Sequence, residues 1–146
     1  MENFQNNHRK LNNQINKFSG KYMNNSKWTK LFYKLSEHHD LVKRCLLKDI
    51  WNEIEREIKI PTIENFSTIF QEKGIKDGRC GPYEFKEIEQ VIFPRTWTKD
   101  RNMRAQILEP HFFDQNIEKI NSIIKEIGKF ETEFNNESLI IYAYRQ

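Results

Sequence analysis

Apolar residues at helical spacing predict one helix near the amino terminus and another near the carboxyl terminus. In the first helix they recur at i, i+3, i+4 and i+7, and they are Trp28, Leu31, Phe32 and Leu35. Ser26 can accept a hydrogen bond from the first turn, so we expect this helix to begin there. In the second helix, isoleucines form a narrow stripe over residues 117–127, and Gly128 follows in the position of a terminator.

A further stretch, residues 41–58, also carries apolar residues at helical spacing. Asp40 precedes it as a candidate cap and Pro61 follows it as a stop signal, so we predict one long helix here. Residues 1–22 are rich in Asn and Lys, and their large apolar residues are Phe4, Leu11, Ile15 and Phe18. Their spacing is compatible with a short helix in an otherwise polar leader.

Shorter apolar runs predict strands. Residues 67–70 are β-branched and aromatic, which is typical of a strand. The dipeptides Asp-Gly and Gly-Pro within residues 77–82 are turn signals, so we expect a hairpin whose second strand lies in residues 83–93. The alternation of that second run slips between Phe85 and Ile88, which predicts a β-bulge.

The carboxyl-terminal residues 139–144 alternate with both faces largely apolar, as in a central strand. Residues 95–100 read as an exposed turn, and residues 103–108 as a short strand. The pattern therefore predicts one α+β domain over residues 23–146. We expect an antiparallel sheet of three to four strands with about three helices packed on it, and residues 1–22 as a leader outside the domain.

Composition sets the class of protein. The chain has 146 residues, 37% hydrophobic and 31% charged, which is ordinary for one domain that can bury a core without disulfides or a metal. Its apolar runs are too short to cross a bilayer, and its first residues lack a secretory signal, so we expect a cytoplasmic protein. In that reducing compartment Cys45 and Cys80 are expected to remain thiols. The sequence predicts no cofactor.

The charge is uneven along the chain. Residues 1–30 hold six basic residues and one acid, whereas the other 116 residues hold 18 basic and 20 acidic residues. A basic arm of this kind fits either a solvated leader or a segment that binds nucleic acid. The body is slightly acidic, most clearly over residues 109–146, with seven acids and four basic residues.

Catalytic motifs are absent from the sequence: there is no phosphate-binding glycine loop, no Gly-x-Ser-x-Gly and no metal-binding His or Cys pair at helical or Cys-x-x-Cys spacing. His38 and His39 are adjacent, so they point in different directions, and helix capping explains them better than a metal site. An enzyme would have to use Cys80, beside Arg79, with His111 as a distant base. Carboxylate pairs such as Glu53 and Glu57 are expected to lie on a solvated helix face.

One predicted loop combines an aromatic residue with basic ones. Trp97 lies among the basic residues Arg95, Lys99 and Arg101. It can anchor a protein partner, stack on a base, or fold back over the edge of the sheet.

Three local patterns resemble an uncharacterised family of small, stand-alone bacterial domains. They are residues 23–28 (Met-Asn-Asn-Ser-Lys-Trp) before a helix, the turn within residues 77–82 leading into 86–89 (Lys-Glu-Ile-Glu), and the closing 141–144 (Ile-Tyr-Ala-Tyr). The chain departs from the family pattern at Gln90, where an aromatic is expected, and at Ala143, where glycine is expected. The resemblance covers most of residues 23–146 and implies no activity and no catalytic residue.

In length, composition and lack of an active site the chain also resembles bacterial immunity proteins, which bind and neutralise a toxin. This class resemblance implies a non-enzymatic protein that binds a cognate toxin domain. Charge and expected exposure nominate these contact residues: Glu53, Glu57, Glu64, Trp97, Glu131, Glu133 and Glu137. The alternative is an accessory protein that binds nucleic acid through residues 1–22 and the 95–104 loop.

Overall fold

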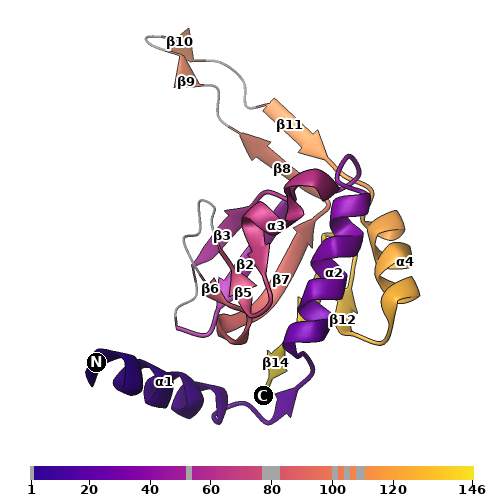
Figure 1. Ribbon diagram of the computed structural model, residues 1–146. Coiled ribbons are helices and arrows are strands. Elements are labelled where there is room, and N and C mark those ends of the chain that lie inside the picture. The colour runs from indigo at the N-terminus through magenta and orange to yellow at the C-terminus, as the bar shows by residue number, and fades with distance from the viewer. Residues whose placement is uncertain (1, 52–53, 77–82, 100–101, 104–105, 108–110) are drawn as a thin grey trace.

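The computed structural model describes residues 2–51, 54–76, 83–99, 102–103, 106–107 and 111–146 (Figure 1). The helices are α1 (Glu2–Ile15), α2 (Asn25–Glu37), α3 (Phe66–Ile69) and α4 (Ile117–Ile127), with the 3-10 turns η1 (Ile63–Asn65) and η2 (Phe85–Glu87). The strands are β1 (Gly20–Lys21), β2 (Cys45–Asp49), β3 (Glu55–Ile58), β4 (Phe70–Gln71), β5 (Gly74–Ile75), β6 (Tyr83–Glu84), β7 (Ile88–Pro94), β8 (Thr96–Lys99), β9 (Asn102–Met103), β10 (Gln106–Ile107), β11 (His111–Asp114), β12 (Glu131–Phe134), β13 (Ser138–Tyr142) and β14 (Tyr144–Arg145). The predicted α+β class is confirmed.

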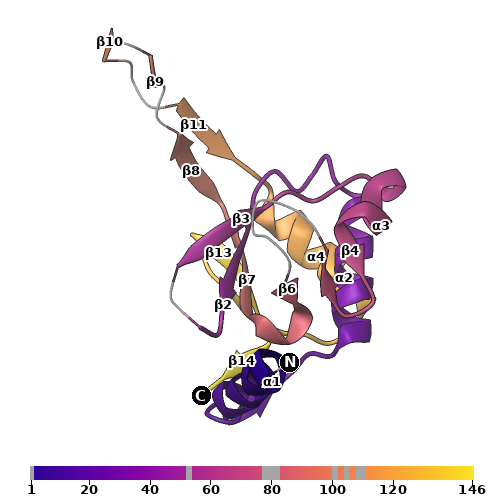
Figure 2. The ribbon, with the colours of Figure 1, turned by 60° about the vertical axis from the view of Figure 1, so that its left-hand side comes forward.

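A five-stranded antiparallel sheet organises the molecule, in the order β12-β13-β7-β2-β3. Helices α2 and α4 pack together against one side of it, as Figure 2 shows. The strand residues that face these helices alternate along each strand, as a buried sheet face requires, and they include Leu47, Val91, Phe93, Leu139 and Ile141. The core therefore lies between this side of the sheet and the two helices.

Aromatic rings fill the part of the core that lies under α2. Phe32 is fully buried and stacks on Phe70 at a centroid distance of 4.5 Å. Trp28 and Phe85 also stack on Phe32, at centroid distances of 5.6 and 6.0 Å. Through Phe70 this cluster joins α2 to a small second sheet, β4-β5-β6.

Helix α1 packs at the end of the main sheet. Its buried residues Leu11 and Ile15 contact Ile50, and the side-chain amide of Gln14 donates to the carbonyl of Ile50 at 2.9 Å. The chain then forms β1, which pairs with β14 near the carboxyl terminus. The predicted short helix in the leader is thus present, and part of it packs on the body.

A two-stranded ribbon projects from the sheet. Strand β7 continues past Arg95 into β8, which pairs with β11, and β9 pairs with β10 farther out. Both views show this ribbon extending away from the helices and the main sheet (Figures 1 and 2). The predicted exposed turn at residues 95–100 is wrong, because residues 96–99 form a paired strand. The single short strand predicted at residues 103–108 is not formed as such, because Met103 ends β9 and residues 106–107 are β10, which pairs with β9 in antiparallel fashion.

The predicted helix over residues 41–58 is also wrong. This segment forms β2 and β3, with β2 in the interior of the sheet between β7 and β3. Successive strand residues point to opposite sides of a sheet, so Leu47 faces the core and its apolar neighbour Leu46 faces the other side. The same run satisfies helical spacing, and pairing with distant strands decides between the two structures.

Smaller corrections follow the same logic. The strand predicted at residues 67–70 is mostly the short helix α3, and the main sheet has five strands, not three to four. Asn24, not Ser26, caps α2, since its side chain accepts from the amide of Lys27 at 2.8 Å. Asp40 precedes no helix. The slip after Phe85 is the turn η2, followed by a register shift where β7 pairs with β2.

Two further expectations concern turns. The predicted hairpin between residues 67–70 and 83–93 is wrong in its strands, because β6 pairs with β5 and most of residues 83–93 forms β7 of the main sheet. Its predicted turn, residues 77–82, lies outside the described residues. The helix predicted at residues 117–127 and the strand predicted at residues 139–144 are confirmed as α4 and as β13 with the start of β14.

Phe32→Ala tests the aromatic core. We expect it to lower the free energy of unfolding by about 3–5 kcal/mol, because it leaves a cavity between α2 and the second sheet. The control Tyr33→Ala removes the neighbouring ring, which is 45% exposed, and should cost about 1 kcal/mol or less. Urea unfolding followed by circular dichroism measures both, and equal losses would contradict the assignment.

Candidate functional site

The side of the main sheet opposite α2 and α4 is the candidate site, and we call it the open face. Strand pairing places Leu46, Ile92 and Ile140 side by side at its centre, on β2, β7 and β13. Leu46 and Ile140 are partly exposed, whereas Ile92 between them is 8% exposed. No described helix lies over this side in Figure 2. The centre of the open face is therefore a small apolar surface to which each of these three strands contributes one side chain.

Acidic residues lie at both margins of the same row. Glu57 of β3 is directly opposite Leu46, and Glu133 of β12 is directly opposite Ile140. Directly paired residues point to the same side of a sheet, and four strand spacings separate the two margins by about 19 Å. Two groups of carboxylates that are remote in sequence thus face the same way.

At the β12 margin, Arg145 fixes the acids. Its guanidinium forms ion pairs with Glu131 at 3.2 Å and with Glu133 at 3.7 Å, and it lies 4.2 Å from the centre of the Tyr142 ring. Burial first, and then the negative charge of Glu133, raises the pKa of the Tyr142 hydroxyl, so this group is neutral at physiological pH. This margin is an ordered cluster of two acids, one cation and one aromatic ring.

At the β3 margin, Arg44 connects the open face to the ribbon. Its guanidinium lies 3.9 Å from the Glu57 carboxylate and 5.7 Å from the centre of the Trp97 ring. Cation–π contacts of this kind hold an aromatic ring without covering it fully. Trp97 is therefore placed beside the open face, at the foot of the ribbon.

Aromatic rings cover one side of the ribbon. Trp97 of β8 stacks on its cross-strand partner Phe113 at 5.8 Å, with the ring planes only 9° apart. His111 also stacks on Phe113, at a centroid distance of 4.6 Å. Phe112 points to the opposite side of the ribbon and is 76% exposed. The ribbon thus presents apolar rings on both sides, which is typical of a surface that binds another molecule.

Gln115 holds the foot of the ribbon. Its side chain is 5% exposed, and its carbonyl oxygen accepts from the amides of Lys43 at 3.0 Å and Arg44 at 3.1 Å. Its amide nitrogen donates to the carbonyls of Arg44 at 2.9 Å and Pro94 at 2.7 Å. All four hydrogen bonds that an amide group can make are used. One buried side chain therefore ties the start of β2, the end of β7 and the end of β11 together.

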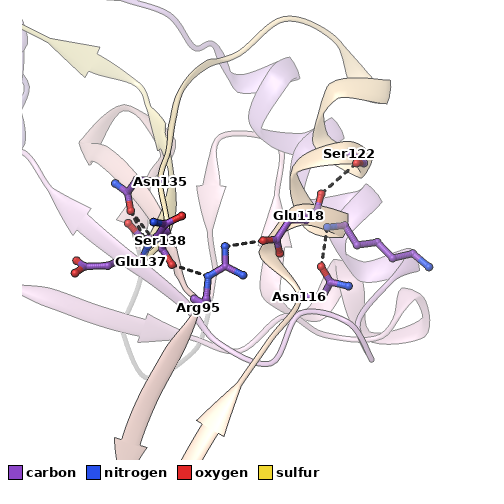
Figure 3. Close-up of polar contacts among 9 residues, drawn as sticks. Arg95, Asn116, Glu118, Ser122, Asn135, Glu137 and Ser138 are labelled. Atoms are coloured by element: carbon purple, nitrogen blue, oxygen red, sulfur yellow. Dashed lines mark hydrogen bonds and ion pairs between the residues drawn. The ribbon is translucent and has the colours of Figure 1, made fainter.

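Arg95 fixes the other side of the foot (Figure 3). Its guanidinium is 2.6 Å from the Glu118 carboxylate at the start of α4, and its backbone amide donates to the carbonyl of Glu137 at 2.8 Å. The hydrogen bond from Arg95 lowers the pKa of Glu118, so the pair stays charged in mild acid. The ribbon is thereby positioned relative to α4 and to the turn between β12 and β13.

Of the predicted contact residues, four lie on or beside the open face. They are Glu57 and Trp97 at the β3 margin, and Glu131 and Glu133 at the β12 margin. Glu64 lies in η1, which contacts α2 and α3, so it is not on the open face. Glu137 lies in the turn beside Arg95, with an exposed side chain. Glu53 lies outside the described residues, and since β3 replaces the predicted helix, it cannot share a helix face with Glu57.

Sequence reasoning missed Arg44, Gln115, Tyr142 and Arg145. The alternation of residues 139–144 already separates Tyr142 from the core positions, so it could have signalled that this ring faces outward. The roles of Arg44 and Gln115 depend on contacts with segments 53 and 71 positions away, and local spacing holds no trace of them.

The histidines and cysteines that the sequence offered for catalysis or metal binding lie in several places. His38 caps the carboxyl end of α2 as predicted, and His39 lies 3.0 Å from Asp40. Cys45 is buried in the core, whereas Cys80 lies outside the described residues. Within the described ranges, no group of three or more His, Cys, Asp or Glu side chains is placed to hold a metal ion.

The helices of the described chain are all too short or too polar to cross a membrane. Comparison with protein families, with curated proteins and with solved structures finds no match.

Gln115→Met tests the foot of the ribbon. Methionine fills a similar volume but leaves the amides of Lys43 and Arg44 without their acceptor, which should lower the free energy of unfolding by about 2–4 kcal/mol. Amide exchange of β8 and β11 should accelerate with it. The control Gln90→Met, on the half-exposed open face, should change stability by about 0.5 kcal/mol at most. Equal effects of the two variants in urea unfolding would contradict this role of Gln115.

Proposed function

We propose that this protein binds another protein through the open face and the ribbon, and that it is an immunity protein. In this proposal it neutralises a toxin by covering the toxin's active site, and it has no catalytic activity of its own. The observation that carries the proposal is the placement of Glu57, Trp97 and Glu133 around one apolar surface, since these residues come from distant parts of the chain.

The open face carries a net negative charge, which supports binding of a basic partner protein. Among the described residues, pairing and ion pairs place five acids and three cations on this face: Glu55, Glu57, Glu89, Glu131 and Glu133, with Arg44, Lys48 and Arg145. A net negative surface attracts a positively charged protein and repels the phosphates of nucleic acid. Toxins that act on nucleic acid carry such positive surfaces at their active sites, because they must bind phosphates.

The side chains of the open face are already held in place before a partner binds, which supports tight binding. Arg145 holds Glu131 and Glu133, and the stack with Phe113 holds Trp97, so these side chains lose little freedom when a partner binds. Aromatic and arginine residues at the centre of an interface carry most of the binding energy, whereas charged residues at its margin mainly speed association. Trp97 and Arg44 lie where the open face meets the ribbon, which is the middle of the combined surface, so they fit the first role. Glu57 and Glu133 fit the second.

The test begins with identification of the partner. The tagged chain is purified from its source cell, and the captured protein is identified, produced separately and assayed for growth inhibition and nuclease activity. We expect its activity to fall to zero at about one equivalent of this chain. A captured protein that keeps its full activity would contradict the immunity role. Capture of nucleic acid alone, released by salt, would favour residues 1–22 and the 95–104 segment as the binding element.

Paired variants separate the two roles on the open face. Combining Glu57→Gln with Glu133→Gln should lower the association rate constant about three- to tenfold at low salt and leave dissociation nearly unchanged. Trp97→Ala should accelerate dissociation about 30-fold, as expected for a central anchor. The control combines Glu64→Gln with Glu72→Gln, which removes the same charge from exposed positions away from the open face. Equal effects of the two double variants on association, by surface plasmon resonance, would contradict the proposed surface.

A further inference from the structure

A second site lies apart from the centre of the open face, where the start of α2 meets the end of α4. A hollow of about 540 Å³ lies there, and three lysines line it: Lys27, Lys125 and Lys129. The ring of Phe130, which is partly exposed, supplies its apolar surface, whereas Ile124 beside it is buried in the core. We infer that this hollow binds a small phosphate-bearing molecule whose organic part lies on the ring of Phe130.

The charge of the hollow is strongly positive for its size. The carboxylate that lines it is Glu131, which forms an ion pair with Arg145 at 3.2 Å. Three like charges around one concave surface repel one another, and a multivalent anion between them relieves that repulsion. Concave walls of low dielectric also concentrate the field, so the attraction for an anion is greater here than at scattered surface lysines.

Lys27 is already positioned for this task. Its ammonium donates to the carbonyl of Tyr22 at 2.9 Å and lies 5.2 Å from the centre of the Phe130 ring. An ammonium has three N–H donors, so the bond to Tyr22 fixes its place and leaves donor capacity for a ligand. The lysine and the ring together form one wall with a charged part and an apolar part.

Helix dipoles do not explain the attraction. The amino end of α2 and the carboxyl end of α4 lie side by side at the hollow, and their partial charges are opposite and offset each other. The lysine side chains therefore set the charge of the hollow. Lysine binds phosphate as a point charge. Three lysines therefore attract a ligand with a dianionic phosphate more strongly than a ligand with one singly charged carboxylate.

Phenyl phosphate is the probe, and benzoate is the comparison ligand with one charge and the same ring. Each is titrated into the full-length chain at pH 8 and constant ionic strength, and amide shifts are followed by NMR. We expect phenyl phosphate to give saturable shifts confined to residues 22–27 and 124–132, with an affinity at least about fivefold above that of benzoate, the order of one added ion pair. Equal affinity for benzoate would overturn the assignment to phosphate.

Variants locate the site. Lys27→Gln and Lys129→Gln should each weaken phenyl phosphate binding about fivefold. The matched control is Lys119→Gln, on the first turn of α4 and outside the hollow, and it should leave affinity unchanged within about twofold. Two results would overturn the proposal by showing only a general attraction to lysines. They are chemical shifts that never saturate, and an equal loss of phenyl phosphate affinity in all three variants. Binding of a protein partner to the open face is not read by this experiment, so the two proposals fail independently.

Discussion

The buried amide of Gln115 is the contact on which the rest of the arrangement depends. It joins three backbone segments that are far apart in sequence, and its removal would leave partly buried backbone groups without these partners. Because Gln115 follows β11 directly, the same contact sets where the ribbon leaves the sheet. Arg95 adds a charged contact to α4 on the other side. The ribbon is thus held at its foot by contacts on two sides.

This constraint determines what the open face presents. Arg44, whose backbone Gln115 holds, carries the side chain that reaches both Glu57 and Trp97. At the other margin, Arg145 orders Glu131 and Glu133 beside Tyr142. The result is an apolar centre with ordered acids on either side and an aromatic residue at one end. The lysines of the hollow near Phe130 give the chain a second surface of opposite charge.

The sequence predicts the elements whose stability is local and misses those that depend on distant partners. Helices α2 and α4 carry clear apolar stripes and polar caps, and β13 alternates regularly, so all three were predictable. Residues 41–58 satisfy helical spacing equally well, and only pairing of β2 with β7 and β3 makes them strands. For the same reason, charge and expected exposure nominated Glu57 and Glu133, but the strand order that places them on one face could not be read from the sequence.

Methyl NMR of the chain, with and without its captured partner, shows which surface the partner covers. With isoleucine and leucine methyl groups labelled, Leu46 and Ile140 report on the open face, and Ile127 and Leu31 report on the helical layer. We expect large shifts or broadening at Leu46 and Ile140 on addition of the partner, with Ile127 and Leu31 almost unchanged. Shifts confined to the helical layer, with Leu46 and Ile140 unaffected, would contradict it.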